Sequence, residues 1–282
     1  MNRDETLLAF NAAGLQRVRT DMESLVENSI RLASRLVSTA LPVGASRLGG
    51  QPDLPDGEAW PLLGDAPMSF VGQIRLEDVA PFDSNGWLPK TGLLSFFYDQ
   101  NQETYGASPS DCGGWKVLYL SGGPASLRPR PFPDSLAQEA RFKVCALTPA
   151  SEATLPGSPA QHLPDLQWSP DEVHRYEDLL ANYPSAQDHT ELHHRMFGHP
   201  EQIQDDMQLQ SALYANNLED PDDPAAAPFL ARKADWKLLL QVDSDYNAGM
   251  RWASSGRLYF WIELQALKAL AFDRTWVVLQ SE

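Results

Sequence analysis

The chain has 282 residues, of which 43% are hydrophobic and 21% charged, and its formal net charge is −16. This length can bury a core without staples, and the two cysteines build no disulfide framework, so a reducing, cytoplasmic compartment is expected. The acidic balance argues against nucleic acid as a partner, because Lys and Arg supply affinity for phosphates. No apolar run approaches the ~18 residues of a membrane helix, and the start lacks the basic-then-apolar profile of a signal peptide.

Residues 1–40 are predicted to form a helical segment, with the main helix between Thr20 and Leu36. Thr20 and Glu23 have the spacing of a capping box, which satisfies the free amides at the start of a helix. The apolar residues that share one helical face are Met22, Leu25, Val26, Ile30, Ala33 and Leu36. Pro42 ends the pattern because proline cannot continue a helix.

Residues 41–147 are predicted to form a first β unit. Short runs of β-branched and aromatic residues alternate here with turns rich in Pro, Gly and Asp, which is typical of antiparallel sheet. The predicted strands are Ser69–Arg75, Leu93–Asp99, Trp115–Leu120 and Arg141–Leu147.

Residues 148–235 are predicted to be a proline-rich linker followed by a helical insertion. Five prolines between 148 and 170 favour irregular backbone. Ser169 and Glu172 form a capping box around a proline at the first helical position, so a helix should run to about Tyr183. Its expected buried stripe is Val173, Tyr176, Leu179 and Leu180.

The acidity of the chain is concentrated in this insertion. Residues 152–224 contain two basic and 15 acidic side chains, a net charge of −13 out of −16. A further helix is expected after Pro200, through Ile203, Met207 and Leu213, and a loop at 219–224. Such a segment either keeps the chain soluble or steers a basic partner. The residues expected to meet such a partner are Asp205, Asp206, Glu219, Asp220, Asp222 and Asp223.

Residues 236–282 are predicted to form a second β unit that echoes the first. Its strands are Trp236–Asp243, Arg257–Glu263 and Thr275–Gln280. Arg47–Pro52 and Met196–Pro200 are similar turns, and each precedes a strand that carries one glutamine, Gln73 or Gln241. The sequence therefore predicts an α+β fold. It comprises two similar, mostly antiparallel β units from an internal duplication, an N-terminal helix and an acidic helical insertion, all in one compact domain.

Several of these motifs together carry a family resemblance that spans residues 46–280. They are Ser46–Pro55 with Trp60-Pro61, Ser69–Ile74, Leu88–Asp99, Phe197–Pro200 with Gln204, Trp236–Gln241, Asp243–Asp245, Gly256–Phe260 and Trp276–Gln280. As a set they resemble the bacterial YwqG-like family of uncharacterised proteins. The resemblance implies an α+β protein rich in antiparallel sheet and supplies no catalytic mechanism. It also hints at a place beside toxin genes, where an acidic immunity protein would make sense.

Gln73, Gln241 and His199 are the first candidates for a ligand site. A buried amide in an apolar strand needs hydrogen-bond partners, so each glutamine either braces nearby backbone or faces a cleft between the β units. Bracing is favoured, because most side-chain hydrogen bonds go to backbone or water. His199 is expected to be a turn residue, with cleft lining as the alternative.

Asp243, Asp245 and Trp252 complete the candidate ligand site. Strand alternation places the two aspartates with Gln241 on one face. They would hold Ca²⁺ or Mg²⁺, share a proton, or cap the turn after the strand. The turn-capping role is favoured, since the segment lacks the Gly and distal Glu of an EF-hand loop.

His189 and His193 have the i, i+4 spacing of two zinc ligands, but two ligands without a Cys pair indicate a polar helix surface more strongly than a metal site. Phosphate-binding glycine motifs and the G-x-S-x-G elbow are absent from the sequence. We therefore expect neither a cofactor nor a metal, and we favour a binding protein over an enzyme.

Two functions remain open at this level. The favoured one is engagement of a protein partner through the acidic surface, as a toxin-neutralising immunity protein would do. The alternative is a small-molecule or metal-binding protein, or an enzyme, whose cleft lies between the two β units.

Overall fold

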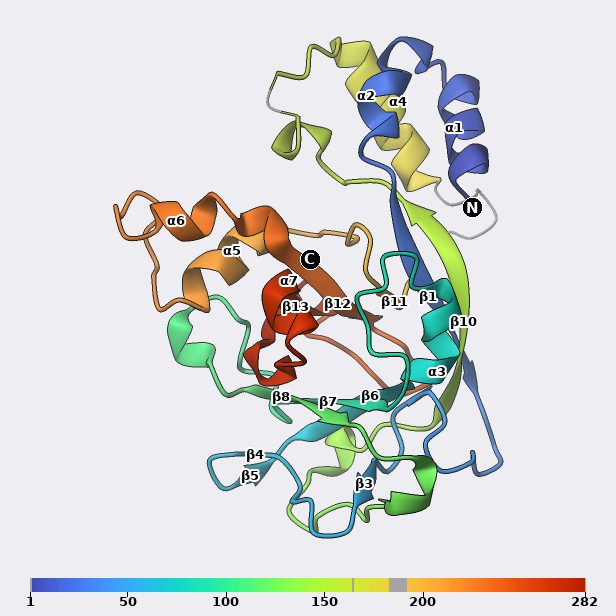
Figure 1. The fold of residues 1–282 in the computed structure, drawn as a ribbon, viewed down its shortest axis with the longest axis vertical. Coiled ribbons are helices and arrows are strands. Elements are labelled where there is room, and N and C mark those ends of the chain that lie inside the picture. Colours follow the sequence, from blue (N-terminus) through green and yellow to red (C-terminus); the bar gives the residue numbers. More distant parts are fainter. Residues whose placement is uncertain (1, 164, 183–191, 282) are drawn as a thin grey trace.

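The computed structural model describes residues 2–163, 165–182 and 192–281, which form a mixed α+β structure (Figure 1). Ten strands of these residues form one antiparallel sheet in the order β14-β13-β12-β11-β1-β10-β2-β6-β7-β8. Their bounds are β1 (Glu27–Leu36), β2 (Arg47–Leu48), β6 (Ser69–Arg75), β7 (Leu93–Tyr98), β8 (Trp115–Leu120), β10 (Cys145–Thr154), β11 (Arg195–Met196), β12 (Trp236–Asp243), β13 (Arg257–Glu263) and β14 (Trp276–Gln280). Two small ribbons pair β3 (Asp53–Pro55) with β9 (Leu127–Pro129) and β4 (Leu62–Leu63) with β5 (Ala66–Pro67).

The sheet curls until its two edges almost meet, which gives a nearly closed barrel. Trp115 on β8 and Trp276 on β14 pack edge to face, with ring centroids 4.9 Å apart. The Trp115 indole N–H donates to the carbonyl of Thr275 at 2.7 Å, and that of Trp276 donates to the carbonyl of Gly106 at 3.1 Å. The two edge strands, β8 and β14, are not paired by a backbone ladder. These side-chain hydrogen bonds close the gap between them, which we call the barrel seam.

Helices surround the barrel and build a separate lobe at one end. The helices of the described residues are α1 (Arg3–Ala12), α2 (Arg19–Glu23), α3 (Leu76–Val79), α4 (Pro170–Ala181), α5 (Met207–Tyr214), α6 (Ala227–Leu230) and α7 (Leu264–Lys268). Figure 1 shows α1, α2 and α4 together beyond the ends of the long strands β1 and β10. No helix in the described parts of the chain has the length and apolar character to cross a membrane.

The lobe has its own small hydrophobic core. Its buried members are Phe10, Leu15, Val18, Met22, Val26, Ala153, Leu155 and Tyr176. The predicted capping box of Ser169 and Glu172 opens α4, and Glu172 also pairs with Arg17 at 2.5 Å. Of the expected stripe, Tyr176 is buried and Leu179 and Leu180 pack against this core, whereas Val173 is exposed.

The predicted helix from Thr20 to Leu36 is wrong. A short helix ends at Glu23, and Glu27–Leu36 is strand β1, paired along its whole length with β10. The strand has Ile30 and Leu32 buried two residues apart, so alternation and not the helical period matches its burial. Tertiary pairing has overridden the local helical pattern.

Most other predicted elements agree with the structure. The strands β6, β8, β12 and β13 have the predicted bounds. The predicted strand Arg141–Leu147 is displaced: β10 begins at Cys145 and continues to Thr154, through the first of the linker prolines. Pro149 is tolerated there because it lies opposite Leu32 in a long two-strand pairing that other residues maintain.

The sheet has the same order of short and long strands on both sides of its central pair, β1 and β10. From the β1–β10 pair outward, one side is β10-β2-β6-β7-β8 and the other is β1-β11-β12-β13-β14. The short strands β2 and β11 end in turns with two consecutive residues of positive φ. These are Gly49 and Gly50 at 61° and 74°, and Phe197 and Gly198 at 59° and 68°.

Candidate functional site

Gln73 and Gln241 both brace backbone. The Gln73 amide donates to the carbonyl of Ala45 at 3.0 Å and accepts from the N–H of Asp53 at 3.0 Å. The Gln241 amide donates to the carbonyl of His193 at 2.7 Å and accepts from the N–H of Glu201 at 2.9 Å. Each fully buried glutamine therefore ties together the two ends of its own turn.

An arginine in each turn repeats the same arrangement. Arg47 pairs with Asp53 at 2.8 Å and donates to the carbonyl of Gln51. Arg195 pairs with Glu201 at 3.0 Å and donates to the carbonyl of His199 at 3.2 Å. Both arginines thus bind the carbonyl four residues later and the carboxylate six residues later, so the two turns share one internal design.

The second turn lies in a larger buried ionic network. Arg195 also contacts Glu152, which pairs with Arg31 at 3.0 Å, while Arg257 bridges Glu201 and Asp243. Burial would raise the pKa of the Asp243 carboxyl, yet the charge of Arg257 keeps it below its ordinary value. Burying several charges costs free energy unless they pair, and here every arginine has a carboxylate partner.

Asp245 and Trp252 serve the turn that follows β12. Asp245 accepts from the backbone N–H groups of Asn247 and Ala248 at 2.8 and 3.2 Å, and from the Ser34 hydroxyl at 2.7 Å. The Trp252 indole is fully buried and donates to the carbonyl of Asp243 at 3.1 Å. Both residues therefore have structural partners at the end of the strand.

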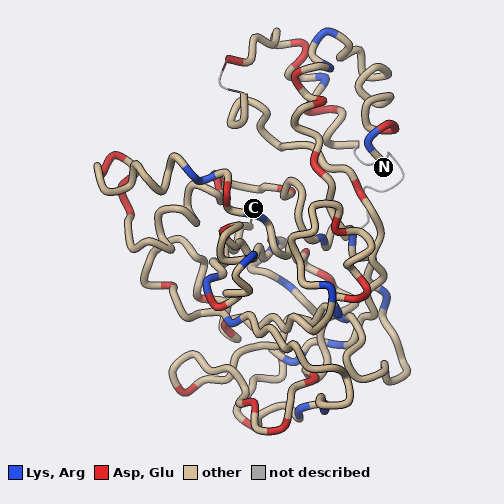
Figure 2. Tube along the Cα trace, in the orientation of Figure 1, with Lys and Arg blue, Asp and Glu red and all other residues tan. Residues whose placement is uncertain are grey.

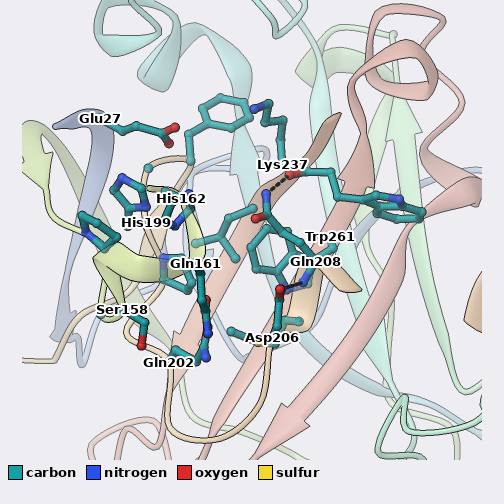
Figure 3. Close-up of a pocket in the computed structure, with 18 of the residues that line it drawn as sticks. Glu27, Ser158, Gln161, His162, His199, Gln202, Asp206, Gln208, Lys237 and Trp261 are labelled. Atoms are coloured by element: carbon teal, nitrogen blue, oxygen red, sulfur yellow. Dashed lines mark hydrogen bonds between the residues drawn. The ribbon is translucent and has the colours of Figure 1, made fainter. Parts of the chain in front are cut away.

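A cavity with a volume of about 50 Å³ lies where the base of the helical lobe meets the barrel (Figure 3). Its walls come from β1, the 3₁₀ turn Pro159–Gln161, the turn after β11, α5, β12 and β13. The polar side chains on it include Glu27, Ser158, Gln161, His162, His199, Gln202, Asp206, Gln208 and Lys237. The apolar ones include Trp87, Phe197, Met207, Trp236, Leu238 and Trp261.

One side of the cavity carries a carboxylate and two imidazoles. Figure 3 shows Glu27, His162 and His199 on this side. The His199 ring packs edge to face on His162, with centroids 5.2 Å apart, and its Nε2 lies 2.6 Å from the carbonyl of Leu25. A carbonyl only accepts, so Nε2 carries the proton, and burial lowers the pKa of His199. The ring is therefore neutral, and its Nδ1 is an acceptor.

The opposite side carries donors. Lys237, Gln208 and Trp261 lie there in Figure 3. The Lys237 ammonium is 5.5 Å from the ring centroid of Trp87 and donates to the carbonyl of Ala234 at 2.8 Å. Trp261 is only 3% exposed, and its indole N–H has no hydrogen-bond acceptor among the described residues. A buried donor without an acceptor is rare and costly, so it calls for an explanation.

Side chains of the barrel hold the segment between these two sides. The Tyr259 hydroxyl donates to the carbonyl of Glu201 at 2.5 Å, and the Gln280 amide oxygen accepts from the N–H groups of Ile203 and Gln204. Asp206 then caps α5, accepting from Gln208 N–H at 3.0 Å. Strands β12, β13 and β14 thereby fix the backbone that forms one wall of the cavity.

The predicted site residues are therefore dispersed. His199 lines the cavity as well as occupying its turn, and Asp206 lines it while pairing with Lys233 at 2.6 Å. The remaining predicted ligand residues do not line this cavity: Gln73, Gln241, Asp243, Asp245 and Trp252. The two glutamines belong to separate turns on opposite halves of the sheet.

The predicted partner residues fall into two places. Glu219, Asp220, Asp222 and Asp223 are exposed on the loop between α5 and α6, which Figure 2 shows as an acidic tip. Asp205 is exposed elsewhere, at the segment held by Gln280. Asp220 and Asp223 also stabilise the loop, because each carboxylate accepts a backbone N–H two residues on.

Sequence reasoning missed Glu27, His162, Lys237 and Trp261. The cavity is lined by segments that are far apart in the sequence, so no spacing of residues along the chain predicts it. One signal was available: Lys237 is the one cation in the apolar strand Trp236–Asp243, and a charge in such a strand must reach solvent or a partner.

No metal centre emerges from the residues described. His189 lies outside them, and His193 contacts the carboxylate of Glu201. In the described ranges, no group of three or more His, Cys, Asp or Glu side chains is arranged to hold a metal ion.

The model of one protein family, a domain of unknown function named DUF1963, matches residues 46–281. No curated protein matches the chain. Because the family model covers most of the sequence, the chain belongs to the DUF1963 family.

Proposed function

We propose that this DUF1963 protein is a binding protein, and that the cavity between the helical lobe and the barrel takes a small polar molecule. The observation that carries the proposal is the indole N–H of Trp261. It is buried on the cavity wall without an acceptor among the described residues, which a bound ligand would supply. Cavities that mix aromatic walls with a few polar groups are the usual form of small-molecule sites.

The support of the cavity favours binding over simple imperfect packing. One wall, residues 199–206, is held by hydrogen bonds from Gln241, Tyr259 and Gln280 on three successive strands. A binding site gains affinity when its groups are already fixed in place before the ligand arrives. Such extensive hydrogen bonding is expected where ligand binding depends on the geometry of the cavity wall.

Gly157 offers a direct test of the proposal. It lies on the cavity wall, its φ is not in the left-handed region, and a Cβ added there meets nothing within 4 Å. Gly157→Leu should therefore fold normally while filling the entrance of the cavity. Thermal shift against a chemically varied metabolite panel should reveal a compound that stabilises the natural protein and loses its effect in Gly157→Leu.

Gly123→Leu is the matched control, because Gly123 is equally free of neighbours and lies in an exposed loop away from the cavity. Gly157 also borders a second cavity, lined by His193 and Arg195. Trp261→Phe therefore completes the design. A ligand that is lost in Gly157→Leu but unaffected in Trp261→Phe belongs to that second cavity and contradicts the proposal, as does a panel with no stabilising compound.

An acidic surface that engages a basic protein, in the manner of a toxin-neutralising immunity protein, is the second candidate. It is favoured by the exposed loop residues Glu219, Asp220, Asp222 and Asp223, whose carboxylates form no ion pair within the described residues. Association should then weaken steeply with salt. Pull-down at low and high salt, with Asp222→Asn/Asp223→Asn as the variant, tests it. Capture that is indifferent to both salt and the variant would remove this candidate.

We also infer that the two halves of the barrel arose by internal duplication and that the chain is YwqG-like. The support is the repeated set of bonds made by Arg47 and Gln73 in one half and by Arg195 and Gln241 in the other. Arg47, Gln73 and Gln241 lie within the motifs that carry the YwqG-like resemblance, and Arg195 lies two residues before the motif Phe197–Pro200. The acidic helical segment between the halves would then be an insertion.

A further inference from the structure

We propose that the ligand of this cavity is a small zwitterion with an apolar body, of the class of single amino acids. This inference rests on the function proposed above and adds the chemistry of the ligand. Its basis is the division of charge across the cavity, with a carboxylate on one side and an ammonium on the other (Figure 3).

The carboxylate side suits an ammonium group. Glu27 is the first residue of β1, and its carboxylate has no ion pair or hydrogen bond within the described part of the chain. The neighbouring His199 presents Nδ1 as an acceptor, since its Nε2–H is held by the carbonyl of Leu25. A ligand ammonium would find a negative charge and a neutral acceptor here, and His162 adds an aromatic edge.

The opposite side suits a carboxylate. Lys237 supplies the ammonium charge, and its single carbonyl partner leaves two N–H groups to bind a ligand. The Trp261 N–H lacks an acceptor among the described residues, and a carboxylate oxygen is a strong one. The other ammonium nearby, Lys233, is already paired with Asp206 at 2.6 Å.

The space between the two sides is apolar. Trp87 packs edge to face on Phe197 with centroids 5.2 Å apart, and Leu238 and Met207 continue this surface. An aliphatic or aromatic side chain of the ligand would lie against it.

The same charge pattern disfavours anionic ligands such as phosphate esters. A phosphate would meet the carboxylates of Glu27 and Asp206 with only Lys237 left to neutralise it. One free charge of each sign instead matches a molecule that carries one of each.

Calorimetric titration with valine, leucine and phenylalanine, each also N-acetylated or C-amidated, tests the inference. The free zwitterion should bind about tenfold to hundredfold more tightly than either blocked form, as expected for loss of a charged hydrogen bond. Glu27→Gln should weaken the free forms and leave the N-acetylated forms unchanged. Lys237→Met should abolish the preference for a free carboxylate. Trp261→Phe should weaken the binding of every ligand form that has a free carboxylate.

Glu139→Gln and Lys90→Met, both exposed and outside the cavity lining, are the matched charge controls and should bind as the natural protein does. Equal binding of free and blocked forms, or no binding of any form at millimolar concentration, overturns the zwitterion inference. The Gly157→Leu screen then decides separately whether the cavity binds another kind of molecule.

Discussion

Two histidines are held neutral in charged surroundings, and they determine how the molecule responds to acid. Burial, and after it the charges of Arg195 and Arg31, lowers the pKa of His193 to about 4. Burial also lowers the pKa of His199. In the unfolded chain both imidazoles titrate near their ordinary value of 6.5. Between these pH values the unfolded chain binds more protons, so acid favours unfolding.

We therefore expect the free energy of unfolding to fall by about 1–3 kcal/mol as the pH is lowered from about 6.5 to 4. Urea titration across this range measures it, and His193→Gln should flatten the profile. Asp243 and Asp53 have lowered pKa values, so their contribution is lost only below about 3.8 and is separable. An unchanged profile in His193→Gln would show that His193 is not held neutral.

The two bracing glutamines should be equivalent in stability. Gln73→Leu and Gln241→Leu each remove the bonds to one backbone N–H and one backbone carbonyl, and each leaves one buried backbone group, the N–H of Asp53 or the carbonyl of His193, without this partner. Each should lower the free energy of unfolding by about 2–4 kcal/mol. Gln138→Leu, at an exposed position, is the control and should change little. A large difference between the two variants would contradict the equivalence of the two turns.

At the scale of elements, the local sequence pattern was sufficient to predict a helix or strand that is buried on one face or on all sides. The strand Trp236–Asp243 and the capping box before α4 were readable because alternation, apolar runs and caps are local signals. Strand β1 was not, because its apolar residues also fit a helical face and only its partner β10 decides the matter. That partner lies more than a hundred residues away.

The candidate site was less predictable than the fold. Bracing by Gln73 and Gln241 followed from the need to satisfy buried amides, and the turn position of His199 followed from its neighbours. Glu27 and Trp261 come together only when β1, β13 and the lobe are assembled, and no periodicity encodes that assembly. Sequence patterns describe elements, whereas the cavity is a property of their arrangement.

The turn after β2 requires glycine at position 49, and substitution of this residue tests the requirement. Gly49 has φ 61°, and a Cβ there would lie 2.2 Å from the carbonyl oxygen of Lys143. Gly49→Ala should therefore lower the free energy of unfolding by about 3 kcal/mol or more, through backbone strain and a clash with another backbone. Gly123→Ala, which meets no neighbour, is the control for urea unfolding. Equal stability of the two variants would contradict the described turn.

At the scale of the whole molecule, two hydrophobic cores of unequal size share one pair of strands. The barrel core includes residues from both halves of the sheet, whereas the lobe core has eight buried members. The lobe should therefore open at a lower free energy than the barrel. Hydrogen exchange followed by mass spectrometry should show faster exchange in α1 and α4 than in β12 and β13. Uniform protection across these elements would mean that the molecule opens as a single unit.

Of the two cysteines, one provides a natural site for attaching a label near the barrel seam. Cys112 is exposed in the loop before β8, close to the Trp115–Trp276 contact, whereas Cys145 is buried and burial raises the pKa of its thiol to about 11. Maleimide chemistry needs an accessible thiolate, so a fluorophore or spin label should attach at Cys112 alone. The natural sequence can therefore report on opening of the seam without any engineered residue.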